Sequence, residues 1–283
     1  MRSSKAALLL SVPVLFLIVG VGAAVAIFFH NSFFKNGGMG VILPQLTLDN
    51  YLDLVDEFYL AVMLNTLLIS ALVVVLTILI GYPSALYVAR RRTWTARMFF
   101  LTILASSAMS LVVRALGWIG ILTEGGPLNL ALRAVGMVAQ PVDFFHGNVA
   151  VVIGLVHGFV PLFVLTLLPV LQAIDPHYEE AAAGMGAGAW TVMWRVTLPL
   201  SMTGVIGGGL LVFAICMGAF TTAVLLSGGS TSTFFPILIS QQVASLINYP
   251  MGAAMAVELL VVVLAIVWLS ILATRRFMYG TGP

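Results

Sequence analysis

The sequence has very little charge. Only 8% of its 283 residues are charged, while 61% are hydrophobic. A soluble domain of this length needs roughly a quarter of its residues charged to cover its surface. The surface of this chain must therefore face something other than water, and lipid is the obvious candidate. The net charge of +2 is also too small to favour nucleic-acid binding.

Cysteine and lysine are scarce as well. Cys216 is the single cysteine, which excludes a disulfide within the chain and a cysteine-based metal site. The only lysines are Lys5 and Lys35, and neither follows a glycine as the lysine of a nucleotide-binding P-loop does. The sequence also lacks a Gly-x-Ser-x-Gly nucleophile motif and any His/Cys metal spacing. We therefore expect no catalytic residue, no metal site and no ATPase activity in this chain.

Long apolar runs make up most of the sequence. A membrane-spanning helix needs about 20 apolar residues, and continuous rather than alternating runs favour helices over a barrel. The first run resembles a signal peptide with a cleavage site at Ala24-Val25-Ala26, but it exceeds the roughly 7–15 apolar residues of such a peptide, so we interpret it as a retained helix. The second and fifth runs are long enough to need a tilt or a break. The six predicted spans are about 7–29, 61–89, 98–122, 148–171, 199–226 and 249–273.

Basic residues fall unevenly on the two sides of these spans. Because arginine and lysine accumulate on the cytoplasmic side of a membrane, their distribution predicts that both termini and the segment between spans four and five are cytoplasmic. The predicted fold is an all-α membrane protein, a single domain over residues 1–283 in which span one lies at the edge of a core bundle over about 61–273. The basic residues on the predicted inner side are Arg2, Lys5, Arg90, Arg91, Arg92, Arg97, Arg195, Arg275 and Arg276, against Lys35 and Arg133 outside.

The predicted outer side carries most of the acidic residues. Residues 46–60 also show apolar positions at helical spacing, which predicts an amphipathic helix after the first span. An acidic outer face agrees with a cationic solute, but it is also what the inward bias of basic residues leaves behind. The acidic residues concerned are Asp49, Asp53, Asp56, Glu57, Glu124 and Asp143.

A polar, glycine-rich segment separates spans four and five, over about 172–198. Asp175 and Pro176 suit a helix start, and a cluster of three glycines after "HYEEAAA" predicts the end of that helix. A second helix then enters the membrane at Leu198-Pro199. The predicted shape is helix, glycine elbow, helix, which suits docking into a groove of a partner. Composition alone leaves an ordinary loop equally open, whereas a dinucleotide fingerprint is excluded because no strand precedes the glycines.

The same segment carries a specific motif. Glu180-Ala181-Ala182, then Gly186, then Val196-x-Leu198-Pro199 resembles the EAA motif of type I ABC importer permeases. Every spacing of that motif is matched, and only its isoleucine is replaced, by Val196. Further stretches resemble the polyamine branch of the family, the third with an apparent extra Ser227. They are residues 65–90, 111–129, 225–243 and 248–254.

The resemblance implies a multi-pass permease subunit in the bacterial inner membrane that forms the pathway for a small polar solute, polyamine or polyamine-like and opine-like compounds included. It implies an ABC ATPase dimer that binds ATP and Mg, a periplasmic or tethered binding protein, and a second permease, which is a related chain or a second copy. It also implies that the segment docks to the ATPase. The implied coupling residues are Glu179, Glu180, Ala181, Ala182, Gly186, Leu198 and Pro199.

Two other classes of protein compete with this interpretation. A secondary transporter or channel acting alone needs an internal repeat or intramembrane sites for a coupling ion, and the sequence shows no convincing repeat. A membrane-embedded enzyme needs a catalytic set, which the sequence lacks. Copurification of an ATPase separates these classes from an importer.

Ionisable residues inside spans are costly and tend to be functional. Arg114, His157 and Glu258 each lie about 8–9 residues into a span, so at 1.5 Å per residue they share a depth of roughly 12–14 Å and are predicted to form a layer around a pore. The open alternatives are that Arg114 reaches outward to the interface, that Glu258 pairs with it, and that His157 is a packed neutral residue. The resemblance adds Phe220, Thr221 and Thr222 as gate or solute contacts.

Overall fold

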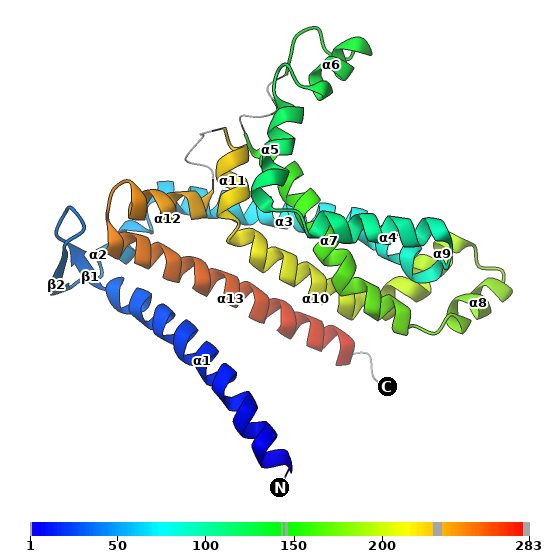
Figure 1. The fold of residues 1–283 in the computed structure, drawn as a ribbon, viewed down its shortest axis with the longest axis horizontal. Coiled ribbons are helices and arrows are strands. Elements are labelled where there is room, and N and C mark those ends of the chain that lie inside the picture. The colour runs from blue at the N-terminus through cyan, green and yellow to red at the C-terminus, as the bar shows by residue number, and fades with distance from the viewer. Residues whose placement is uncertain (1, 143, 145–146, 229–233, 280–283) are drawn as a thin grey trace. The chain divides into compact units, whose positions relative to one another are not determined.

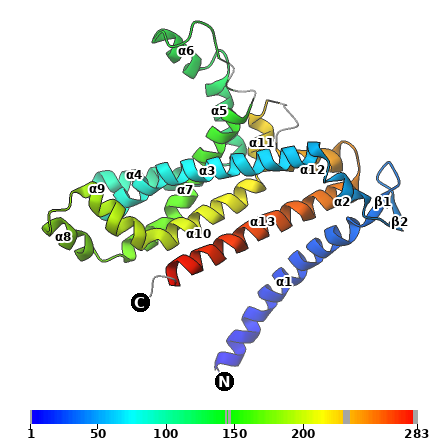
Figure 2. The same cartoon turned by 180° about the vertical axis from the view of Figure 1, so that it is seen from behind.

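The computed structural model describes residues 2–142, 144, 147–228 and 234–279. The chain divides into two compact units, one formed by Met1–Met63 with Ile237–Pro283 and the other by Leu64–Pro236. Figures 1 and 2 show a chain made almost entirely of helices. The elements in chain order are α1 (Arg2–Asn31), β1 (Phe34–Asn36), β2 (Ile42–Leu46), α2 (Asp49–Asp53), α3 (Glu57–Arg90), α4 (Trp94–Ser107), α5 (Leu111–Leu122), α6 (Pro127–Ala134), α7 (Asn148–Ala173), α8 (His177–Gly184), α9 (Ala189–Val192), the π-helical turn η1 (Met193–Thr197), α10 (Leu198–Met217), α11 (Phe220–Leu226), α12 (Phe235–Ala244) and α13 (Tyr249–Tyr279).

Six helical stretches of the described residues are apolar and long enough to cross a membrane, which confirms the predicted number of spans. The second, α3, runs for 34 residues without a break, so it is about 50 Å long and exceeds the thickness of the hydrocarbon core. The fifth does break, between α10 and α11 at Gly218-Ala219. The six stretches are Pro13–Asn31, Glu57–Arg90, Leu111–Ala134, Asn148–Ala173, Ala189–Met217 and Tyr249–Thr274.

The prediction of one continuous third span over 98–122 is wrong. The structure divides it into α4 and α5, with Ser110 in an extended conformation between them. Two features account for the break. The serines there compete for backbone acceptors, as Ser107 Oγ does by donating to Leu104 O at 2.7 Å, and the Arg114 guanidinium takes up carbonyl groups at the end of α4.

The first unit contains a feature that the sequence did not predict, an antiparallel hairpin of β1 and β2 in which Lys35 lies opposite Leu43. The predicted helix over 46–60 is only partly confirmed, because β2 ends at Leu46 and the helical residues are divided between α2, which covers five residues, and α3, which begins at Glu57. The buried Asn50 explains this arrangement, since its Nδ2 donates to the carbonyl oxygens of Ser32 and Phe34, both at 2.9 Å. In the same unit α13 contacts α1, β1 and α2 (Figure 1).

In the second unit, α7 is the central helix and the most buried one, and it packs against α4, α5, α10 and α11. Small residues allow its close approach to α10. A Cβ added at Gly204 would lie 2.9 Å from Leu167, and one at Gly208 would lie 3.0 Å from Phe163. On the other side of α7, a Cβ at Gly154 would overlap Leu226 of α11. These glycines therefore serve the close packing of the helices.

Candidate coupling segment and membrane pathway

The polar segment begins with a capped helix, as predicted. Asp175 Oδ1 accepts a hydrogen bond from the backbone N–H of His177 at 3.0 Å, and it lies 2.6 Å from the imidazole Nδ1 of the same residue. Pro176 occupies the position just before α8. The two bonds from His177 lower the pKa of the Asp175 carboxyl, and the bond from Asp175 raises the pKa of the His177 imidazole.

The glycine elbow is a Schellman turn. The backbone N–H of Gly186 donates to Ala183 O at 2.9 Å, and that of Ala187 donates to Ala182 O at 3.1 Å, which satisfies carbonyls at the end of α8. Gly186 has a φ of +88°, a left-handed conformation in which any other residue would be strained. The glycine of the motif is therefore required by the backbone that reverses the chain.

Beyond the elbow the chain is helical again and continues into the membrane. Helix α9 starts after Gly188, passes into the wider turn of η1, and joins α10 at Leu198 without an interruption. Pro199 lies in the first turn of α10, where a missing N–H is tolerated. The predicted order of helix, elbow and helix is confirmed.

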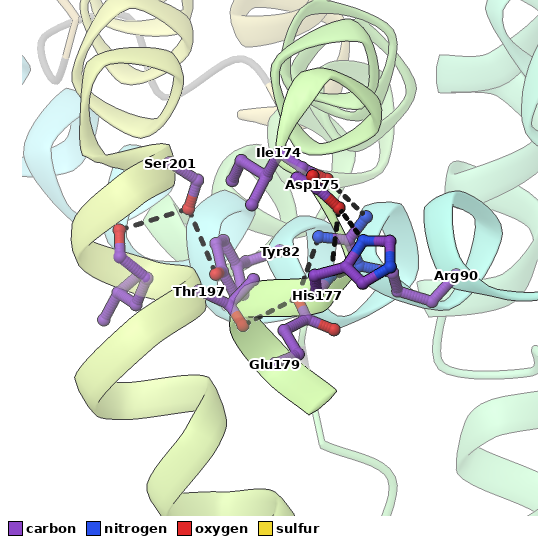
Figure 3. A network of polar contacts seen from close by, with 9 residues as sticks. Tyr82, Arg90, Ile174, Asp175, His177, Glu179, Thr197 and Ser201 are labelled. Atoms are coloured by element: carbon purple, nitrogen blue, oxygen red, sulfur yellow. Dashed lines mark hydrogen bonds and ion pairs between the residues drawn. The ribbon is translucent and has the colours of Figure 1, made fainter. Parts of the chain in front are cut away.

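The two adjacent glutamates of α8 face different surroundings. Arg90 donates from Nη2 and Nε to Glu179 Oε1, at 2.8 and 3.0 Å, and Thr197 Oγ1 donates to the same oxygen at 2.9 Å (Figure 3). The side chains of Arg90 and Glu179 are only 19% and 21% exposed. Glu180, by contrast, is exposed. Glu179, grouped with the partner contacts on sequence grounds, thus has its partners within the chain.

The remaining motif residues present a surface of small and apolar groups. Ala181 and Gly186 are exposed, while Ala182 is buried inside the segment. Sequence reasoning missed the large apolar side chains beside them. In the sequence they are only isolated large residues, and their exposure on a helix-turn-helix projection is visible in the structure alone. The large exposed side chains of the segment are Tyr178, Met185, Trp190 and Trp194.

Arg114 lies at the break between α4 and α5. It is only 7% exposed, and its Nη2 donates to the carbonyl oxygen of Ser106 at 2.6 Å and of Met109 at 3.4 Å. These carbonyls belong to the negative end of α4, which suits a guanidinium. A Cβ on Gly158 would lie 2.9 Å from Arg114 Nη1, so Gly158 leaves the room that the guanidinium occupies.

His157 and the residues around Phe220 line different cavities. His157 Nδ1 accepts a hydrogen bond from Trp118 Nε1 at 3.1 Å, and its ring borders an apolar cavity of about 540 Å³ between α3, α4, α5 and α7. Phe220, Thr221 and Thr222 border a cavity of about 240 Å³ between α5, α7, α10 and α11. The structure therefore does not place His157 beside the residues implied to contact solute.

Glu258 lies on α13, in the first unit. It is half-buried, and its Oε2 has no hydrogen-bond partner among the residues that the structure describes. A buried carboxylate oxygen without a partner is costly unless a ligand or water satisfies it. Asp143, one of the predicted outer acids, lies outside the described residues.

Comparison with known proteins agrees with this geometry. The sequence model of the binding-protein-dependent transport system inner membrane component matches residues 77–278. The spermidine/putrescine transport system permease protein PotB of Haemophilus influenzae is 31% identical over 238 residues, which cover 84% of this chain and 82% of that protein. PotB of Escherichia coli is 29% identical over 231 residues, covering 82% and 84%.

A similar fold is found in a chain from the crystal structure of a bacterial alginate ABC transporter in complex with an alginate pentasaccharide-bound periplasmic protein. The TM-score is 0.74 at 19% identity, and the match covers 96% of this chain and 94% of that one. The predicted permease fold and the multi-pass inner-membrane location are thereby confirmed. The chain is a permease subunit of an ABC importer, and it belongs to the family of binding-protein-dependent transport system inner membrane components.

Proposed function

We propose that this permease imports a polyamine or a related small polar solute, opine-like compounds included. The observation that carries the proposal is the 31% identity to a spermidine/putrescine permease over 84% of this chain and 82% of that protein. The exposed acids Asp49, Asp53, Asp56 and Glu57 support a cationic solute if they face the binding protein. A periplasmic or tethered binding protein delivers the solute to this face.

Energy for transport comes from outside the chain. A separate ABC ATPase dimer binds ATP and Mg, and the coupling segment docks into it, so that closure of the dimer switches the permease between inward-facing and outward-facing states. Glu180, Ala181 and Gly186 form the exposed docking surface. Ala182 packs inside the segment, and Leu198 and Pro199 lie where it enters α10. This chain itself is not an enzyme and holds no cofactor.

The pathway is completed by a second permease, a related chain in a heterodimer, with all of residues 1–283 acting as one permease domain. Both termini and the coupling segment are cytoplasmic in this arrangement. Phe220, Thr221 and Thr222 contribute to the solute route through the cavity that they border. The half-buried Glu258, whose Oε2 has no partner within the described part of the chain, supports a contact with a cationic solute. Arg114 stabilises the break between α4 and α5, beside the cavity that Phe220, Thr221 and Thr222 border.

The test is reconstitution. The chain is coexpressed with an ATPase, a sister permease and a binding protein from the same organism, and the purified complex is placed in liposomes for uptake of labelled spermidine and putrescine. ATP-dependent, binding-protein-dependent uptake supports the proposal. Uptake of a different solute under the same conditions overturns the polyamine assignment. A chain that purifies without an ATPase and transports alone is instead a secondary transporter or channel.

A further inference from the structure

Glu179 lies where three elements of the second unit meet. It belongs to the first turn of α8, whereas Arg90 is the last residue of α3 and Thr197 is the last residue of η1. Figure 3 shows the three side chains converging from these elements. One carboxylate oxygen thus joins the end of a membrane span, the start of the coupling segment and the entry to the next span.

We propose that Arg90 and Glu179 form the joint through which movement of the coupling segment reaches α3, so that Glu179 is a positioning residue within the chain and Glu180 is the outward contact. This inference rests on the proposed function, in which the segment docks to an ATPase. It goes further by assigning different tasks to two neighbouring glutamates.

The geometry of the joint favours transmission of force. The arginine fork donates twice to Glu179 Oε1, and Arg90 Nη1 donates to the carbonyl oxygen of Ile174 at 3.3 Å, at the end of α7. Charge-assisted bonds from a planar guanidinium are strong and directional. Because the pair is about four-fifths buried, water does not readily replace it. Helix α8 therefore cannot shift without moving the end of α3 or breaking these bonds.

A second contact repeats the link deeper in the unit. Tyr82 OH and Ser201 Oγ are 3.1 Å apart, and both are buried. Ser201 Oγ donates to Leu198 O at 3.1 Å, which leaves Tyr82 as the donor to Ser201. Tyr82 precedes Arg90 by about two helical turns, and Ser201 follows Thr197 by about one. Helices α3 and α10 are therefore linked at two levels, so movement of the coupling segment displaces both helices.

The two glutamates cannot share a task, because successive residues of a helix point about 100° apart. Glu179 faces the chain and Glu180 faces outward. If the Arg90–Glu179 pair only held the segment in place, its loss would affect assembly and stability alone. A transmitting joint also changes how much solute is moved for each ATP hydrolysed, and that ratio separates the two roles.

The experiment uses the assembled importer in liposomes, with Arg90→Gln, Glu179→Gln and the double variant. Arg92→Gln is the matched control, because Arg92 is a neighbouring exposed arginine of the same charge. We expect the ATPase to copurify with both single variants, while the solute moved per ATP falls by about fivefold or more in each, and the double variant is no worse than the worse single one. Glu180→Gln instead weakens retention of the ATPase.

Three results overturn the joint. The first is loss of the ATPase in Glu179→Gln but not in Arg90→Gln, which makes Glu179 the partner contact. The second is additivity of the two single effects, and the third is an unchanged ratio. Where the charge variants do not assemble, Thr197→Val removes one of the three bonds to Glu179 and must still lower the ratio; an unaltered ratio there also overturns the joint. A wild-type chain that retains no ATPase refutes the proposed function itself, which is a distinguishable outcome.

Discussion

The indole Nε1 of Trp118 donates a hydrogen bond to the imidazole Nδ1 of His157 at 3.1 Å, across helices α5 and α7. The two rings meet edge to face, with centroids 5.7 Å apart. Since Nδ1 accepts, the neutral imidazole carries its proton on Nε2. This bond ties two helices together at the edge of the 540 Å³ cavity, away from Phe220, Thr221 and Thr222.

We predict that His157→Leu lowers stability without changing the solute preference. The substitution leaves a partly buried indole N–H without its acceptor, which costs about 1–3 kcal/mol. The apparent melting temperature of the detergent-solubilised complex should fall, while the KM for uptake stays within about twofold of wild type. Trp118→Phe should act on the same bond, so the double variant should lose less than the sum. A shift in KM at an unchanged melting temperature would place His157 on the solute route instead.

Gly158→Ala should disturb the seat of Arg114. The added methyl group would lie 2.9 Å from Nη1, so the guanidinium must shift away from the carbonyls of Ser106 and Met109. We expect a loss of about 1–3 kcal/mol and a lower yield of folded complex. Gly207→Ala is the matched control, since an added Cβ there meets no atom of the described residues within 4 Å, and it should be neutral or stabilising. Equal stability and yield of the two variants would contradict the view that Gly158 leaves room for the Arg114 guanidinium.

Much of the fold follows from the apolar runs alone. Because lipid forces the backbone into helices, the number of spans, the ends of α3 and α7 and the start of α13 could be predicted within a few residues, whereas α13 continues six residues beyond the predicted end. The break between α4 and α5 could not, because Ser106–Ser110 is compatible with a helix until a guanidinium from the next helix claims its carbonyls. The hairpin of β1 and β2 was equally hidden, since it depends on Asn50 bonding to a segment sixteen to eighteen residues earlier.

The coupling segment was predictable in its shape but not in its contacts. Asp175 acts on the backbone two residues ahead of it, and Pro176 and Gly186 act through their own backbone, so the local sequence indicates all three. The motif singles out Glu180 in the sequence, but it does not show that Glu179 has its partners within the chain, because Arg90 lies eighty-nine residues away and Thr197 lies beyond the elbow. The predicted depth of Arg114 was counted in a continuous span over 98–122, which the structure divides into α4 and α5. A count along α7 also does not show which side of that helix His157 faces.

The Asp175–His177 pair predicts a pH dependence of coupling. Asp175 raises the pKa of His177, so the stabilisation that comes from the charged imidazole is complete below the ordinary pKa of histidine and is lost as pH rises through the raised value. The lowered pKa of Asp175 has the opposite consequence. The stabilisation that comes from the charged carboxylate is lost only as pH falls through that lowered pKa. The start of α8 is therefore held best between the two.

Retention of the ATPase should accordingly weaken as pH rises from about 6 to about 8, the range in which histidine loses its charge. His177→Gln should flatten this dependence, and Asp175→Asn should shift it to lower pH. The measurement is the affinity of the purified permease for its ATPase at each pH, by surface-immobilised binding. Because both side chains are exposed, the effect should shrink at high salt. A dependence that persists unchanged in His177→Gln would assign it to another group.

Gly186→Ala and Gly184→Ala form a matched pair on the elbow. An alanine at Gly186 must adopt a φ near +88°, which costs about 1–2 kcal/mol, although the described neighbours leave 4 Å of space around the added Cβ. Gly184 is equally open among the described residues but is the last residue of α8 and has no left-handed φ, so alanine is tolerated there. We therefore expect Gly186→Ala to weaken ATPase binding and coupled uptake by about tenfold, while Gly184→Ala retains both. Since neither methyl group clashes within the chain, a loss of binding in both variants would show that the partner packs directly against the elbow, and the backbone conformation of Gly186 would no longer explain the requirement for glycine.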